Sequence, residues 1–182
     1  MIIDCHGHYT TTPPGVAAWR DAQKEAVAAD PDHISSKGVM TVSDDEIRES
    51  IETNQLRVQQ ERGTDVTVFS PRASWMGHHV GNASTSQAWT EHCNDLIRRV
   101  CDLFPTNFVP VCQLPQSPQT PIGTSITELR RCVEEMGFIG CNLNPDPSGG
   151  YWKDLPLGDK YWYPLYAVSY THLTLPTTQV VG

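Results

Sequence analysis

Two histidines stand two positions apart near the start of the chain, directly behind an apolar run, in the segment IIDCHGH. If that run is a β-strand, His6 and His8 project from the same face, about 7 Å apart along the strand. Two imidazoles placed in this way can each direct a ring nitrogen toward one metal ion. A zinc site takes at least three protein ligands, so further His, Asp or Glu must come from elsewhere. The pair predicts two metal ligands, with two hydrogen-bonded strand-end histidines as the alternative.

Three further side chains are candidates for binding an anionic substrate, because they follow later apolar runs. Arg72 could hold a carboxylate by two parallel hydrogen bonds, or it could be a surface arginine paired with an acid. His79, like His78 beside it, could donate a proton near neutral pH, and a solvent-exposed loop pair is the alternative. Asn144 offers a neutral polar contact, with turn formation as its alternative role. Asp4 could support the metal histidines, or make an ordinary strand-end hydrogen bond.

These residues can act together only if the fold brings them to one edge of a sheet. Four apolar runs read as buried strands: Met1–Cys5, Val66–Phe69, Phe108–Leu114 and Phe138–Leu143. The runs are continuously apolar rather than alternating, as in parallel sheets that are covered on both faces. Pro110 lies inside the third run and lacks a ladder donor, so we expect a bulge or a bend there.

Helical patterns separate these runs. Ser43–Glu46 forms a capping box that predicts a helix as far as Arg62, with Gly63 as its left-handed exit. The next helix is predicted by one apolar stripe, and Pro105 ends it. The residues of that stripe are Trp89, Cys93, Leu96, Ile97, Val100 and Phe104.

A third helix is predicted from a second capping box, Ser125–Glu128, and closes at Gly137. The stretch from Thr10 to Thr41 has weaker helical signals and several prolines, so it predicts an elaborated loop. The alternation of strands and helices predicts an α/β fold of parallel βα units. In such folds the active site lies at the C-terminal ends of the strands, which is where His6 and His8 stand.

The last residues depart from this pattern. A helix that begins near Tyr163 would have no room to finish, and the segment after it is rich in threonine and suits a short strand better. The segment VSYTHLTLPTT resembles one found at the ends of many unrelated metagenomic gene fragments. We therefore predict one domain over residues 1–166 and a non-native tail over residues 167–182.

Composition restricts the class of protein. With 182 residues, 38% hydrophobic and 19% charged, the chain has an ordinary soluble composition, and we expect a cytoplasmic protein without a signal peptide or membrane span. The net charge of −8 argues against nucleic-acid binding. The six cysteines are widely spaced, which favours free thiols over a disulfide scaffold. The sequence is compatible with a homo-oligomer.

The opening D-x-H-x-H pattern of IIDCHGH resembles that of the metal-dependent amidohydrolase superfamily, in its branch of small-acid decarboxylases and hydratases. Longer segments are similar to the 4-oxalomesaconate hydratase family: MIIDCHGHYTT, ERGTDVTVFSPRASWMGHHVG, LPQSP and GFIGCNLNPDPSGGYW. The likeness extends from Met1 to about Tyr166. It implies a (β/α)₈ TIM barrel with Zn²⁺, or another divalent metal, held in part by His6 and His8.

The resemblance also implies the reaction, which is addition of water to the tricarboxylate 4-oxalomesaconate to give 4-carboxy-4-hydroxy-2-oxoadipate in protocatechuate and gallate breakdown. The family's remaining ligands, a histidine and an acidic residue, come from later strands than this chain contains. About 166 residues follow the barrel pattern, so we expect some four of the eight βα units of a complete barrel. Two alternatives stay open: a decarboxylase or hydrolase of another unsaturated or aromatic acid, and a non-catalytic truncated fragment.

Overall fold

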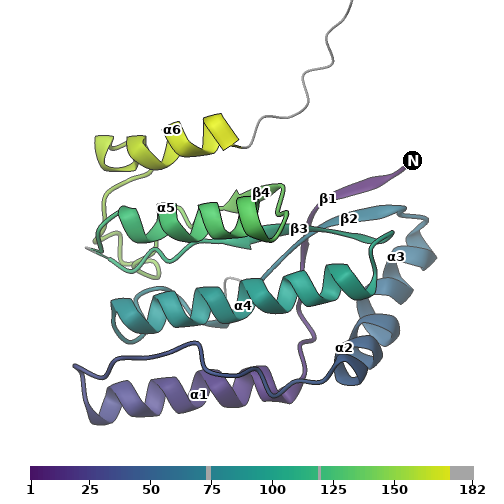
Figure 1. Cartoon of the computed structure of the whole chain (residues 1–182), viewed down its shortest axis with the longest axis horizontal. Helices are drawn as coiled ribbons and strands as arrows, with labels where there is room; N and C mark the ends of the chain where they lie inside the picture. Colours follow the sequence, from purple (N-terminus) through teal and green to yellow (C-terminus); the bar gives the residue numbers. More distant parts are fainter. Residues whose placement is uncertain (73–74, 119, 173–182) are drawn as a thin grey trace, which may run out of the picture.

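The structure, a computed structural model, describes residues 1–72, 75–118 and 120–172. Its four strands form one parallel sheet in chain order: β1 (Ile3–His8), β2 (Val66–Ser70), β3 (Phe108–Gln113) and β4 (Gly140–Asn142). Helices α1, α4, α5 and α6 are stacked in the same order beside the sheet (Figure 1). The parallel α/β fold is thus confirmed. β1 runs further than its apolar residues do, because the ladder to β2 continues through Gly7 and His8.

The irregular strand is β1 and not β3. The register of β1 against β2 shifts between Asp4 and Gly7. The pairing of β3 with β2 continues through Val109 to Pro110 without a shift, so the expected bulge at Pro110 is wrong. The carbonyl of Pro110 accepts from the Ile139 N–H (3.0 Å) on the side of β4. The ladder to β4 begins only at Val111, so the missing N–H of Pro110 costs no ladder hydrogen bond on that side.

The first predicted capping box forms as expected. Ser43 accepts from the N–H of Glu46 (3.2 Å), and the Glu46 carboxylate accepts from the N–H of Ser43 (2.7 Å). These bonds start α2 (Asp44–Ile51), which continues through a π-helical segment, η1 (Glu52–Leu56), into α3 (Arg57–Arg62). Gly63 ends the helix with φ +67°, a left-handed conformation that costs glycine little.

The predicted apolar stripe forms the core-facing side of α4 (Ala83–Leu103). Asn82 caps this helix by accepting from the Thr85 N–H, and Phe104 follows its end. Every residue of the stripe is buried, and the stripe packs against buried residues of the sheet: Phe69, Phe108 and Cys112. The 3.6-residue periodicity therefore identified the helix and its buried face correctly.

The second predicted capping box is wrong. The helix α5 begins earlier, at Gly123, and runs to Arg130 before a π-helical segment, η3 (Arg131–Glu135). Ser125 instead donates its hydroxyl to the carbonyl of Pro115 (2.7 Å). Glu128 is buried and bonds to Arg131 (2.7 Å). Both side chains are taken by partners outside the helix start, so neither is available to cap it.

The predicted loop between Thr10 and Thr41 contains a helix, α1 (Pro14–Ala29). Pro13 and Pro14 lie at its N-cap and first position, where a missing N–H costs nothing. The alanine-rich remainder favours helix. Trp19 docks it onto α4 by stacking on Trp89 (5.7 Å between ring centroids) and His92 (4.5 Å). The prolines therefore mark the start of a helix rather than exclude one.

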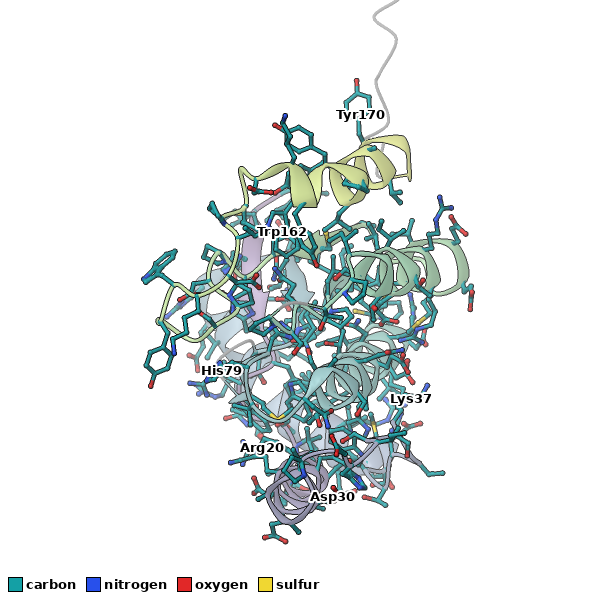
Figure 2. The ribbon with its side chains drawn as sticks, turned by 90° about the vertical axis from the view of Figure 1, so that its left-hand side faces the viewer. Arg20, Asp30, Lys37, His79, Trp162 and Tyr170 are labelled. Carbon is teal, nitrogen blue, oxygen red and sulfur yellow. The ribbon has the colours of Figure 1, made fainter. Side chains whose placement is uncertain are left out.

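The segment after Tyr163 is helical, so the expected strand is wrong for its described part. A 3₁₀ turn, η4 (Lys160–Trp162), leads into α6 (Tyr163–His172), which packs against α5. Trp162 points inward and is buried, whereas Tyr170 projects outward (Figure 2). Residues 173–182 lie outside the described residues, and the non-native tail stays a prediction. Within the described ranges, no helix combines the length and apolar character that a bilayer span requires.

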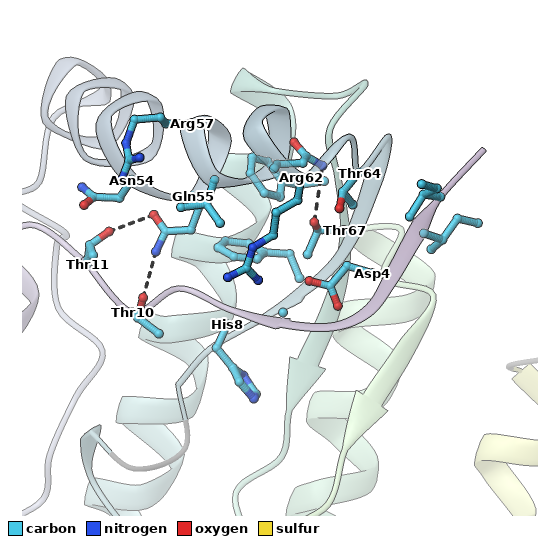
Figure 3. A pocket seen from close by; sticks show the side chains of 17 residues that line it. Asp4, His8, Thr10, Thr11, Asn54, Gln55, Arg57, Arg62, Thr64 and Thr67 are labelled. Carbon is cyan, nitrogen blue, oxygen red and sulfur yellow. Dashed lines mark hydrogen bonds between the residues drawn. The ribbon is translucent and has the colours of Figure 1, made fainter.

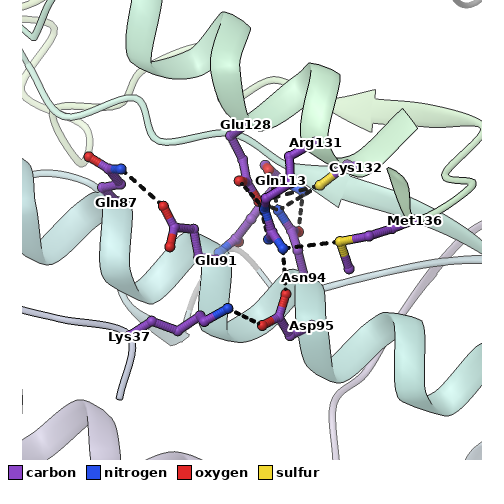
Figure 4. A network of polar contacts seen from close by, with 10 residues as sticks. All are labelled: Lys37, Gln87, Glu91, Asn94, Asp95, Gln113, Glu128, Arg131, Cys132 and Met136. Atoms are coloured by element: carbon purple, nitrogen blue, oxygen red, sulfur yellow. Dashed lines mark hydrogen bonds and ion pairs between the residues drawn. The ribbon is translucent and has the colours of Figure 1, made fainter. Parts of the chain in front are cut away.

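A chain of charged groups joins α4 to α5 and to the segment before α2 (Figure 4). Arg131 pairs with Glu128 (2.7 Å) and with Asp95 (2.8 Å), and Lys37 holds the second oxygen of Asp95 (2.6 Å). Asn94 donates to the buried Glu128 carboxylate (2.7 Å). The hydrogen bond to Glu128 raises the pKa of Arg131, so the guanidinium stays charged. Glu128 is therefore buried as a paired ion.

Buried histidines should make the fold acid-sensitive. His78 is buried, and its Nδ1 accepts from the Ser86 hydroxyl (2.8 Å) and the Gln116 N–H (3.4 Å). Burial lowers its pKa from 6.5 to about 4. The unfolded chain therefore binds more protons between these values, and the free energy of unfolding falls as pH falls.

We expect His78 to contribute a loss of about 2 kcal/mol between pH 7 and pH 5, measured by urea denaturation. His78→Asn, whose side-chain oxygen can accept the same two bonds, should reduce this pH dependence. The half-exposed His33 provides the control, since His33→Asn should retain it. An unchanged pH dependence in His78→Asn would contradict the assignment.

Candidate metal centre

The rings of His6 and His8 converge at the C-terminal end of β1. Their Nε2 atoms are 3.0 Å apart, and the ring planes are nearly perpendicular, at 87°, with centroids 4.6 Å apart. The strands end at His8, Ser70, Gln113 and Asn142, so the pair stands at the edge where the sheet presents its strand ends. The convergence expected from the i, i+2 spacing is confirmed.

The spacing of the two ring nitrogens fits two ligands of one divalent ion. With Zn–N bonds of about 2.0–2.1 Å, tetrahedral coordination places two nitrogens about 3.3 Å apart, and a smaller angle gives about 3.0 Å. Within residues 1–72, 75–118 and 120–172, no group of three or more His, Cys, Asp or Glu could hold a metal ion. The described residues therefore offer two ligands, and metal binding by His6 and His8 stays a prediction.

His8 is anchored by contacts on the far side of its ring. Its Nδ1 lies 2.8 Å from the Ser70 hydroxyl and 3.1 Å from the Pro71 carbonyl. Burial lowers its pKa most, the hydrogen bond to Pro71 opposes this, and the charges of His6 and Arg72 lower the pKa further. The lowered pKa favours the neutral imidazole, which is the state that binds a metal.

Two cavities lie on opposite sides of β1. The smaller, about 160 Å³, is lined by residues from all four strands, including His6, Ser70 and Asn142. The larger, about 600 Å³, lies between β1 and the η1–α3 segment, and His8 is among the residues that line it (Figure 3). His6 thus lines the smaller cavity and His8 the larger one.

Asp4 faces the larger cavity rather than the histidine rings (Figure 3). Its carboxylate accepts from the backbone N–H of His6 (3.1 Å). Of the two roles considered for Asp4, this contact is the ordinary strand-end hydrogen bond. It supports the backbone of β1 at the register shift.

The structure places Arg72 near the histidine pair, whereas His79 contacts glycines of two loops. Arg72 is exposed, and its charge acts on His8. His79 is exposed, but its ring lies against two glycines, Gly77 and Gly149. His78 is buried, so the expected solvent-exposed loop pair is wrong for this residue. Substrate binding by Arg72 and His79 stays a prediction.

Asn144 takes part in a turn. Its side-chain oxygen accepts from the Asp146 N–H (3.0 Å). Its backbone N–H and carbonyl both bond to the amide of Gln116, at 2.7 and 3.1 Å. The turn-forming role is therefore present in the structure, and a substrate contact by the remaining amide stays a prediction.

Sequence reasoning missed two residues that organise the loops around the site. Gln116 is buried and links the loop after β3 to Asn144 and to His78. Asp146 accepts from the N–H groups of Ser148 (3.0 Å), Gly150 (2.6 Å) and Trp152 (3.2 Å). Burial raises the pKa of Asp146, but the hydrogen bond from the Ser148 hydroxyl and these backbone bonds outweigh it and lower the pKa overall. The signal available was the Asn-x-Asp-x-Ser pattern, which is typical of side-chain-capped turns.

A side chain at Gly149 should displace the His79 ring. A Cβ there would lie 2.1 Å from the His79 ring, and its φ of +76° disfavours other residues. We expect Gly149→Ala to destabilise the fold by more than Gly150→Ala, whose φ is +95° but whose Cβ would have open space. The backbone strain alone costs about 1–2 kcal/mol in each. Urea denaturation measures the difference, and the His79 ring resonances should move only in Gly149→Ala. Equal effects would contradict the close contact.

Residues 3–169 match the sequence profile of the amidohydrolase family. This chain belongs to that family. A curated relative from Sphingobium sp. (strain NBRC 103272 / SYK-6), named 2-keto-4-carboxy-3-hexenedioate hydratase, is 57% identical over 166 residues, which are 91% of this chain and 48% of the relative. This amidohydrolase chain therefore spans about half the length of the curated relative it matches.

Solved structures agree with the family assignment. The crystal structure of 4-oxalomesaconate hydratase, LigJ, from Rhodopseudomonas palustris has a TM-score of 0.83 and 47% identity, covering 94% of this chain and 50% of that one. A dihydroxybenzoic acid decarboxylase from Polaromonas sp. JS666, solved with bound manganese, has a TM-score of 0.60 and 20% identity, covering 93% and 46%. The latter likeness shows the fold alone. The four βα units correspond to the N-terminal part of the amidohydrolase barrel.

Proposed function

We propose that this chain supplies two metal ligands and part of the substrate site of a zinc-dependent hydratase. The reaction is addition of water to 4-oxalomesaconate, a small anionic tricarboxylate, giving 4-carboxy-4-hydroxy-2-oxoadipate. The observation that carries the proposal is the convergence of the His6 and His8 Nε2 atoms, 3.0 Å apart at the C-terminal end of β1. The 57% identity to a relative named as a hydratase supports the choice of reaction.

Each proposed role rests on position and charge. His6 and His8 hold the metal ion, which when bound would polarise substrate oxygens or lower the pKa of bound water. Arg72, beside His8 in a protein of net charge −8, binds a substrate carboxylate. His79 and Asn144 contribute neutral or proton-donating contacts from the loops after β2 and β4. We assign no general acid or base within this chain.

A chimaera tests the proposal. Residues 1–166 are joined to the second half of the Sphingobium hydratase, whose own first half is 57% identical. With added zinc, the chimaera should consume the absorbance of the conjugated substrate and yield a product heavier by one water. Mass spectrometry measures the zinc and manganese contents of the chimaera, because a related decarboxylase structure contains manganese. A product lighter by carbon dioxide would favour the decarboxylase alternative.

The 182-residue chain alone provides the matched comparison. Because its described residues offer two converging ligands and no larger metal-binding group, we expect weak zinc binding and no turnover. A folded, zinc-loaded chimaera without hydratase activity would contradict the proposal if the parent hydratase is active under the same conditions. Turnover by the 182-residue chain, abolished by His6→Ala, would show that another group completes the site.

A further inference from the structure

We propose that Ser70 and Asn142 fix the tautomer of His8, so that its Nε2 presents a lone pair toward His6 before any metal binds. These two residues act as positioning residues, from the ends of β2 and β4. The inference deepens the metal role of His8 proposed above and rests on it only for its consequence in metal binding. The tautomer itself is a property of the metal-free chain.

The Ser70 hydroxyl has one proton and three neighbours. It donates to the carbonyl of Gly7 (3.1 Å), which cannot donate in return. The Asn142 amide donates to the same oxygen (3.0 Å), which occupies one of its lone pairs. The third neighbour is His8 Nδ1, at 2.8 Å. With its proton committed to Gly7, Ser70 can only accept from His8, so Nδ1 must carry a proton.

Pro71 leads to the same assignment independently. Its carbonyl oxygen lies 3.1 Å from His8 Nδ1 and can only accept a hydrogen bond. An unprotonated Nδ1 would direct a lone pair at this oxygen. The Nδ1 proton is therefore shared between Ser70 and Pro71, and in the neutral ring Nε2 is left unprotonated.

The network also assigns the contact between the two histidines. If His8 Nε2 is a lone pair, the 3.0 Å contact requires His6 Nε2 to carry the proton in the metal-free chain. His8 thus has the protonation state of a metal ligand in advance, whereas His6 must give up its Nε2 proton when a metal binds.

Asn142 makes this arrangement depend on β4. Ser70 is buried, at 2% exposed, so its hydroxyl has no bulk water with which to exchange partners. The bond from Asn142 joins the strand end of β4 to that of β2, and the bond from His8 joins β1. The Asn142 amide occupies one Ser70 lone pair, so the hydroxyl proton and the remaining lone pair are directed at Gly7 and His8 alone.

The test reads the tautomer directly. Two-bond ¹H–¹⁵N correlation spectra of the metal-free full chain at about pH 8, above the ordinary histidine pKa of about 6.5, distinguish protonated from unprotonated ring nitrogens. His8 should be protonated at Nδ1 and His6 at Nε2. Ser70→Ala should give a mixture of both tautomers at His8, and Asn142→Ala a smaller change in the same direction. The His8 signals are identified with His8→Asn.

A matched control removes a hydroxyl from a different histidine. Ser86→Ala deletes the group that lies 2.8 Å from His78 Nδ1 and should leave the His8 tautomer unchanged. Zinc affinity, measured by competition with a chromogenic chelator, should fall about tenfold in Ser70→Ala and stay unchanged in Ser86→Ala. If Ser70→Ala does not fold, Asn142→Ala carries both measurements, since Asn142 is only half-buried.

Two results would overturn the inference. One is a wild-type His8 protonated at Nε2. The other is a wild-type tautomer that persists in Ser70→Ala, or in Asn142→Ala where that variant replaces it. The proposed hydratase role is decided separately by the chimaera, so its failure would leave the tautomer spectra of this chain to decide the inference.

Discussion

Replacing His6 with alanine in the chimaera is expected to lower kcat/KM for 4-oxalomesaconate by about 10³-fold or more. His6 and His8 direct their Nε2 atoms to one point, 3.0 Å apart, so removing one leaves the ion with too few ligands. A metal that polarises the reacting oxygens supplies several kcal/mol, and 10³-fold corresponds to about 4 kcal/mol. The measurement combines steady-state kinetics with the zinc content of the purified protein.

The control for this variant is His33→Ala, which removes a half-exposed histidine from the loop after α1. It should retain both zinc and turnover. If His6→Ala keeps its zinc and loses only turnover, the histidine acts on the substrate and not as a ligand. Retention of both would assign the pair to the alternative of hydrogen-bonded strand-end histidines.

Arg72→Ala in the same chimaera should lower kcat/KM by about 10²-fold, which corresponds to about 3 kcal/mol from one charge-assisted carboxylate contact. Arg72 is exposed and its charge acts on His8, which places a cation near the histidine pair. Arg72→Lys should recover only part of the loss, because an ammonium cannot form two parallel bonds to a carboxylate.

The matched control for Arg72 is Arg57→Ala. Arg57 is an exposed arginine on α3, paired with Glu61 (2.6 Å), and its charge is not among those that act on His8. Its loss should change the kinetics little, since exposed i, i+4 pairs contribute about 0.3–0.5 kcal/mol. Equal effects of Arg72→Ala and Arg57→Ala would indicate a general charge effect and remove Arg72 from the proposed site.

The elements that the sequence predicted are those whose signal is local and periodic. The stripe of α4 and the capping box of Ser43 depend on residues three or four positions apart, and both formed as expected. The convergence of His6 and His8 follows from their i, i+2 spacing on a strand, and Ser70 and Pro71 then anchor the His8 ring. In each case the pattern that predicted the feature lies within one element.

The features that sequence reasoning missed depend on partners far along the chain. Ser125 has the spacing of a cap, but the Pro115 carbonyl is near enough to take its hydroxyl. Gln116 bonds to backbone groups of Asn144, 28 positions further on, which no local pattern encodes. Asp146 is the exception, because its partners are close in sequence and the Asn-x-Asp-x-Ser pattern marks them. The helix α1 was obscured because its prolines lie at its first turn and its buried face contains one residue, Val16.

The strand order of the sheet bears on how the protein forms during synthesis. β1, β2, β3 and β4 pair in the order in which they leave the ribosome, so each new strand finds its partner already made. Translation proceeds at about 5–20 residues per second, which leaves seconds between successive strands for the intervening helices to dock. This topology suits vectorial, co-translational folding, in which the histidine-bearing strand β1 is the first part of the sheet to emerge and acquires its neighbour once β2 follows.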